Sequence, residues 1–174
     1  SRSNFAKISA TGQLDTGFSP DLGGAVSCVA VQPNGKILLG GSFVSVSGYA
    51  LPRFARLTAD GFVDPTFSPL LNPDDAVTSI ALQSDGKIVI GGMFTKIKGN
   101  AAGRIARLQS NGVHDQGFVA NSNSRVYVAV VAGDGTIYVG GQFTQINDTP
   151  VRMVARMKND PTSESIEVAS GDVQ

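Results

Sequence analysis

A stretch of 18 residues recurs three times along the chain, and this repetition limits the possible folds more than any other feature. Each copy holds two apolar runs joined by Asn34-Gly35, Asp85-Gly86 or Asp134-Gly135. Such dipeptides between β-rich runs are strong hairpin signals, because both central positions of a type I′ turn need positive φ. The sequence therefore predicts three equivalent β-hairpins. They cover residues 26–43, 77–94 and 126–143.

A second segment follows each hairpin and also precedes the first one. Its fullest copy runs from Arg53 to Phe67 and contains Ala55-Arg56-Leu57, a turn, and then Asp64. Further copies lie at residues 5–18 and 104–118, and a reduced copy lies at 154–157. We expect two short strands from this segment and two from each hairpin. The chain is therefore predicted to be all-β, with three four-stranded antiparallel repeats of about 50 residues and partial repeats at both ends.

Four-stranded antiparallel units with a period of about 40–50 residues are typical of β-propeller blades. A β-trefoil, which also has three repeats, is the alternative, although the second segment occurs four times. The predicted repeat array covers residues 1–157, with units joined near residues 25, 76 and 125. Residues 158–174 are predicted to form a polar C-terminal tail or a final edge strand.

Each hairpin ends on two glycines, and a phenylalanine follows two residues later. Glycine inside a strand favours a bend or the close approach of another backbone, where a Cβ atom would clash. The phenylalanines are predicted to fill the space between neighbouring sheets. The residues concerned are Gly40, Gly41 and Phe43, then Gly91, Gly92 and Phe94, and finally Gly140, Gly141 and Phe143.

Residues 57–95 contain these marks in a fixed order. Leu57, Asp60-Gly61, Asp64, Phe67 and Pro69 precede Asp85-Gly86-Lys87-Ile88, Gly91-Gly92 and Phe94-Thr95. In this pattern the chain resembles the delta-60 repeat family, and the resemblance extends over residues 4 to about 157. It implies β-propeller blades in a large bacterial protein that is extracellular or on the cell surface. It implies no catalytic residue.

Composition excludes several classes of site. The formal net charge is zero, which gives no general attraction to nucleic acid or to an anionic membrane. One cysteine and one histidine provide neither an internal disulfide nor a zinc site of the usual kind. No apolar run approaches the roughly 20 residues of a membrane-spanning helix. We therefore expect no cofactor, no metal, no nucleic acid and no membrane insertion.

The charged residues that recur with the repeat have two interpretations. Asp15, Asp64 and Asp115 are predicted to cap turns by accepting backbone N–H groups, with calcium binding as the alternative. Arg56, Arg107 and Arg156 alternate with apolar residues and are predicted to pair with a repeat acid or a carbonyl between blades. Their alternative is a row of contacts for carboxylates or sugars.

The loops between equivalent strands differ in sequence while their framework is constant, so contact residues are expected there. Tyr49, Leu51 and Asn100 are the candidate ligand or partner contacts. The favoured function is a non-catalytic structural or binding module of a secreted or surface protein. It would mediate assembly or protein–protein contact with other copies of itself or with further blades of a larger parent chain. A surface protein or a glycan is a further candidate partner.

Two other functions remain as alternatives. One is a carbohydrate-binding propeller module, with Tyr49 and equivalent loop residues as contacts. The other is an enzyme with its site on the ring axis. It is disfavoured because the sequence contains no cluster of polar residues that breaks the repeat.

Propellers usually need about four to eight blades to close, so three units predict an incomplete ring.

Overall fold

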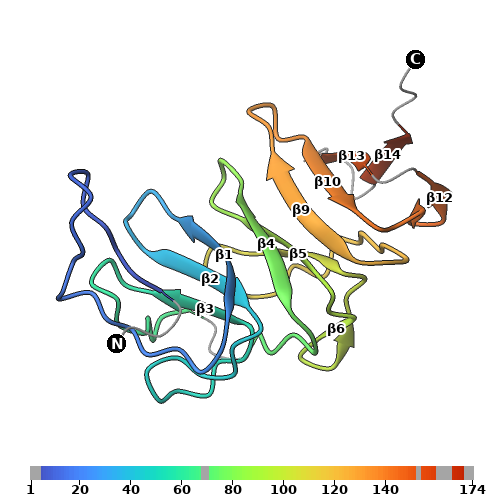
Figure 1. Cartoon of the computed structure of the whole chain (residues 1–174). Helices are drawn as coiled ribbons and strands as arrows, with labels where there is room; N and C mark the ends of the chain where they lie inside the picture. The colour runs from blue at the N-terminus through green and yellow to red at the C-terminus, as the bar shows by residue number, and fades with distance from the viewer. Residues whose placement is uncertain (1–4, 68–70, 152–153, 160–165, 171–174) are drawn as a thin grey trace.

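The computed structural model describes residues 5–67, 71–151, 154–159 and 166–170. Within them the chain forms fourteen strands, paired antiparallel throughout, and no helix. Figure 1 shows the three main sheets side by side in chain order, from blue through green to orange. The described part contains no apolar helix of membrane-spanning length.

The first two sheets are built alike. In the first, β1 (Val26–Val31) and β2 (Ile37–Gly41) form the hairpin, and β3 (Phe54–Leu57) pairs with the far side of β2. In the second, β4 (Val77–Leu82), β5 (Ile88–Gly92) and β8 (Ile105–Leu108) have the same order. The second segment of each repeat thus closes the sheet that its own hairpin begins.

The predicted fourth strand is reduced to one bridge in these two sheets. Leu57 pairs with Val63 in the first, and Leu108 pairs with His114 in the second. The pairing ends because the next residue, Asp64 or Asp115, turns the chain. The Asp64 carboxylate accepts a hydrogen bond from the Thr66 amide, and this local turn replaces a longer ladder.

The third sheet has four full strands. Its order is β14 (Ile166–Ser170), β13 (Val154–Asn159), β10 (Ile137–Gly141) and β9 (Val126–Val131). β14 pairs with β13 from Ala155↔Ser170 to Asn159↔Ile166 and takes the edge position that a single bridge holds in the other sheets.

A small hairpin follows each main hairpin. β6 (Lys96–Ile97) pairs with β7 (Asn100–Ala101), and β11 (Gln145–Ile146) pairs with β12 (Thr149–Pro150). The Val46↔Tyr49 bridge is the equivalent in the first unit. Lys98 and Gly99 at one turn both have positive φ, as a type I′ turn requires. These turns place Tyr49 and Asn100 at the same point of successive units.

Hydrophobic clusters lie between successive units. Phe18 belongs to the cluster of the first sheet, Phe67 to that of the second and Phe118 to that of the third. Each of these phenylalanines therefore leaves its own unit and fills the core of the next. Phe43, Phe94 and Phe143 are fully buried in the same three clusters.

The double glycines serve two kinds of close approach. A Cβ atom on Gly40 would lie 2.8 Å from Val77 Cγ1, and one on Gly91 would lie 2.8 Å from Val126 Cγ1. These valines begin the next unit's hairpin. The second glycine of each pair instead faces the backbone carbonyl of the residue just before its own hairpin, near the bulge where the hairpin register shifts. The carbonyls belong to Ala25 for Gly41, Ala76 for Gly92 and Arg125 for Gly141.

Candidate functional site

The repeated cation and acid meet in a buried pair in the first unit. Arg56 Nε donates to Asp64 Oδ2 at 2.8 Å, and Lys36 Nζ lies 2.8 Å from the same oxygen. The side chains of Arg56 and Asp64 are only 6% and 3% exposed. Asp64 Oδ1 accepts hydrogen bonds from the amide and the hydroxyl of Thr66. Both carboxylate oxygens are thus occupied.

This pair also joins two units. Arg56 donates from Nη1 to the carbonyl of Ser110 in the second unit at 2.7 Å, and its guanidinium lies 4.2 Å from the centre of the Phe67 ring. Burial opposes the charge of Asp64, but Lys36, Thr66 and Arg56 outweigh it and hold the pKa of this carboxyl below its usual range. The charged pair therefore persists at neutral pH.

The other copies of the pair are less buried. Arg107 Nε donates to Asp115 Oδ2 at 2.8 Å, and its guanidinium lies over Phe118. Lys7 and Asp15 are 3.2 Å apart and largely exposed. Arg156 is exposed on β13 and has no ion-pair partner among the described residues. Within the same residues no group of three or more histidine, cysteine or acidic side chains could hold a metal ion.

Two pockets occupy equivalent places in the first and second units, beside the small hairpin and the bridge strand. The pocket of the first unit, of about 310 Å³, contains Tyr49, Leu51, Val63 and Pro65. The pocket of the second unit, of about 250 Å³, contains Asn100 and His114. All three contact residues expected from the loops, Tyr49, Leu51 and Asn100, line one of these pockets.

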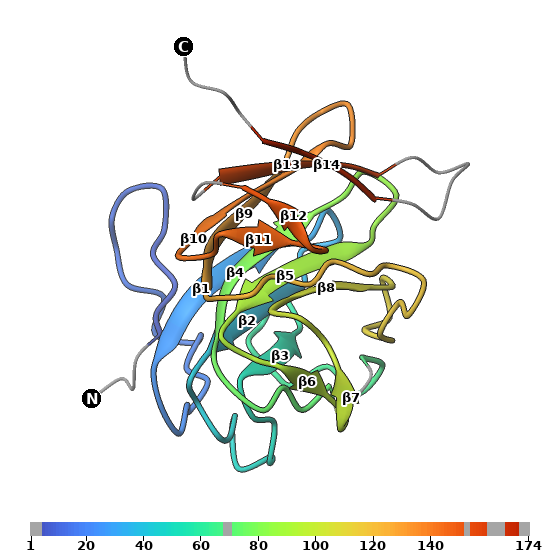
Figure 2. The ribbon, with the colours of Figure 1, turned by 90° about the vertical axis from the view of Figure 1, so that its right-hand side faces the viewer.

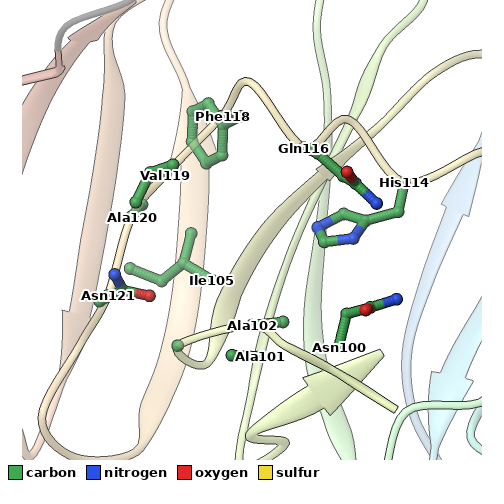
Figure 3. Close-up of a pocket in the computed structure, with 11 residues that line it drawn as sticks. Asn100, Ala101, Ala102, Ile105, His114, Gln116, Phe118, Val119, Ala120 and Asn121 are labelled. Carbon is green, nitrogen blue, oxygen red and sulfur yellow. The ribbon is translucent and has the colours of Figure 1, made fainter. Parts of the chain in front are cut away.

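The second-unit pocket is polar at its rim and apolar at its floor. Figure 3 shows Gln116, His114 and Asn100 gathered on one side, with Asn121 opposite and Ile105 between them. Ile105 and Phe118 are buried, whereas Asn100, Gln116 and Asn121 are exposed. No acidic, lysine or arginine side chain lines this pocket.

The histidine and the cysteine lie in different places. Burial lowers the pKa of His114 below its ordinary value, against the opposing charge of Asp115. Cys28 lies on β1 in the core between the first two sheets, where burial raises the pKa of its thiol to about 12. Cys28 does not line either pocket.

His114 and Gln116 were not among the residues singled out from the sequence as contacts. The signal was present, because they stand where the first unit has Val63 and Pro65. A change from apolar to polar side chains at two neighbouring repeat positions marks the pocket. Tyr49 and Asn100 differ in the same way on its other wall.

A third feature is an open sheet face on the third unit. Val128, Val130, Tyr138 and Val154 are 48%, 53%, 42% and 57% exposed. The register places them on one face, since Val128 lies opposite Gly140, Val130 opposite Tyr138 and Gly140 opposite Val154. We call these four residues the open face. The third sheet, which carries the open face, lies at one end of the row of sheets (Figure 1 and Figure 2).

The comparison with protein families supports the repeat architecture. The family described as "domain of unknown function (DUF5122) beta-propeller" matches residues 32–67, 83–118 and 132–160. Each matched segment begins near a hairpin turn and extends through the next strand segment. No curated protein matches the chain. The match confirms the propeller fold that the resemblance implied, but it does not confirm membership of the delta-60 family. With its three repeated antiparallel sheets, the chain belongs to this DUF5122 β-propeller family.

Proposed function

We propose that this propeller domain is a non-catalytic binding module that assembles through the open face of its third unit. The observation that carries the proposal is a contrast between equivalent positions. Leu38 and Val89, which correspond to Tyr138, are fully buried, and Phe54 and Ile105, which correspond to Val154, are nearly so. Each of them is covered by the next unit.

The proposed occupant of the open face is the first sheet of a second copy. That sheet exposes Val29 and Val31, at 44% and 61%. Their equivalents, Ile80 and Leu82, pack in the core between the first and second sheets. A second copy would therefore offer to β9 and β10 the same kind of apolar strand surface that β4 offers to β1 and β2. The zero net charge adds no overall repulsion to this contact.

The non-catalytic part of the proposal rests on how the reactive groups are used. Asp64 and Asp115 are engaged by arginines, and the pKa of the Cys28 thiol is too high for a thiolate at neutral pH. Hydrolysis needs a nucleophile, a base and an orienting group in mutual contact. His114 lines the second-unit pocket, whereas Cys28 lines neither pocket, so these two groups do not form such a set. The resemblance to the delta-60 repeat family supports a location outside the cell or on its surface.

Light scattering over a range of concentrations tests the assembly. We expect the mass of the wild-type protein to rise with concentration, because a head-to-tail contact joins different surfaces of two copies. Val130→Asp on the open face and Val31→Asp on the first sheet should each lower self-association strongly. Both side chains are exposed, so circular dichroism of the two variants should be unchanged.

Mixing the two variants is the decisive step. Val130→Asp retains an intact first sheet and Val31→Asp retains an intact open face, so an equal mixture should form a dimer that neither forms alone. Val113→Asp, which changes a valine of similar exposure in a turn of the second unit, is the matched control and should associate like the wild type. A wild-type protein that stays monomeric, or a mixture that stays monomeric, would contradict the proposal.

A further inference from the structure

The second-unit pocket gathers several polar side chains around one small cavity. Asn100, His114, Gln116 and Asn121 line it, and their side chains make no hydrogen bond to another described residue. In the same unit, by contrast, Asp115 is engaged by Arg107. The amides and the imidazole therefore point donors and acceptors at solvent within one small cavity (Figure 3).

The opposite wall of this pocket is apolar and fixed. Ile105, Phe118 and Ala120 are buried in the core of the third cluster, and each presents part of its surface to the cavity. Their positions are set by packing between the second and third units, so the pocket needs no folding step to form. A rigid apolar floor beneath a polar rim suits a ligand with one C–H face and several hydroxyl groups.

The lining also restricts the charge of the ligand. None of the pocket residues is acidic, lysine or arginine. The Asp115 carboxylate beside His114 is already paired with Arg107 and does not line the cavity. A neutral imidazole has one donor and one acceptor nitrogen, and each carboxamide has both kinds of group. Such a set matches hydroxyl groups, which donate and accept, and leaves an ionic group without a counter-ion.

From these observations we infer that the second-unit pocket binds one neutral sugar residue. Its volume of about 250 Å³ lies just below the roughly 300–1,000 Å³ of typical ligand pockets, which fits a single ring and not an extended oligosaccharide. This inference does not depend on assembly, because the pocket and the open face contain different residues. It assigns the carbohydrate-binding alternative to the second unit and not to Tyr49.

A comparison with the first unit explains why the sugar site is assigned to the second. Its equivalent pocket has Tyr49 in place of Asn100, Val63 in place of His114 and Pro65 in place of Gln116. The fold therefore forms a cavity at this point whether or not it carries hydrogen-bonding groups. The polar rim is a property of the second unit's own residues and not a requirement of the repeat.

The lone histidine gives a direct test by proton NMR. The chain has one histidine, so the ring protons of His114 give all of the histidine ring signals in the spectrum. Neutral hexoses and N-acetylhexosamines, titrated one at a time, should shift these signals with a dissociation constant on the order of 1–10 mM, as a small open pocket allows. Glucuronic acid and glucosamine, which are charged, should shift them less at the same concentration and pH.

Two variants and a control separate binding from folding. Gln116→Ala removes an exposed rim group and should weaken binding roughly 3- to 10-fold, the usual effect of one lost hydrogen bond. Asn100→Ala should do the same from the other side of the cavity. Gln142→Ala, an exposed glutamine in the third unit outside the pocket, should bind like the wild type.

The titration also shows which form of sugar the pocket accepts. If methyl glycosides bind as well as free sugars, the pocket accepts the terminal residue of a glycan; if only reducing sugars bind, it takes a free monosaccharide. No shift of the His114 signals with any neutral sugar overturns the inference. Binding by both rim variants that is as strong as that of the wild type overturns it as well, and so does stronger binding of the charged sugars. The assembly measured by light scattering is unaffected by either result.

Discussion

In the first unit the pocket beside the small hairpin is lined by Tyr49, Val63 and Pro65, whereas in the second unit the same positions hold Asn100, His114 and Gln116. The junctions of these two units do not differ in this way. The arginine–aspartate distance is 2.8 Å in both, and in both a Cβ atom on the first glycine would lie 2.8 Å from the next unit's valine.

The contrast follows from what each position contacts. A junction residue is fixed by the unit that packs on it, so a different side chain there would disturb two units at once. A pocket residue faces solvent and has no such neighbour. The side chains of this pocket can therefore change from one unit to the next while the fold remains the same.

The largest effect is expected from removing the buried acid of the first junction. Asp64→Ala would leave Arg56, only 6% exposed, without its counter-ion, and should lower the free energy of unfolding by about 3 kcal/mol or more. Urea denaturation measures the change. Asp15→Ala is the control from the same repeat position: its pair with Lys7 is largely exposed, so a loss of similar size there would refute the link between burial and cost.

A smaller loss is expected at the glycine that the next unit covers. Gly91→Ala would place a Cβ atom 2.8 Å from Cγ1 of Val126, a stiff β-branched side chain, and should cost about 1–3 kcal/mol of unfolding free energy. Gly133→Ala is the matched control, because a Cβ atom there meets nothing within 4 Å. Equal melting temperatures for the two variants would show that the units are not held as closely as described.

The junctions were more accessible to sequence reasoning than the pocket. Asn34-Gly35 and its equivalents predict hairpins from local turn chemistry alone, and the repeat of Gly91 marks close contact. The destination of Phe67, the core of the next unit, depends on how sheets are stacked and is not encoded locally.

The same limit applies to the pocket and to the open face. His114 joins the pocket through a single bridge to Leu108, which no periodicity reveals. Val130 is exposed while the equivalent Ala81 is buried, although both belong to β-rich hairpins. Whether such a strand face is covered depends on its neighbour and not on its own sequence.

Exchanging the pocket residues should affect stability far less than changing the junction. His114→Val introduces the residue that the first unit already has at this position, and it should alter the unfolding free energy by no more than about 0.5 kcal/mol. The same urea measurement applies. A loss as large as that of Gly91→Ala would show that His114 is part of the frame, and the division between frame and pocket would then fail.

The smallest effect is a dependence of stability on mildly acidic pH that His114 brings to the second unit. Because burial lowers the pKa of His114 in the folded protein, the unfolded chain binds more protons between that lowered value and the ordinary value of 6.5. The contribution of neutral His114 to stability should therefore be fully present above pH 6.5, and stability should decline as the pH falls through this window.

His114→Val removes the titrating group, so its unfolding free energy should change less than that of the wild type between neutral and mildly acidic pH. The lowered pKa of Asp64 adds its own loss only below the ordinary aspartate value of 3.8, which keeps the two contributions apart. If the wild type and His114→Val respond alike to mild acid, the imidazole is not held neutral by its surroundings, and the first and second pockets differ less than their residues indicate.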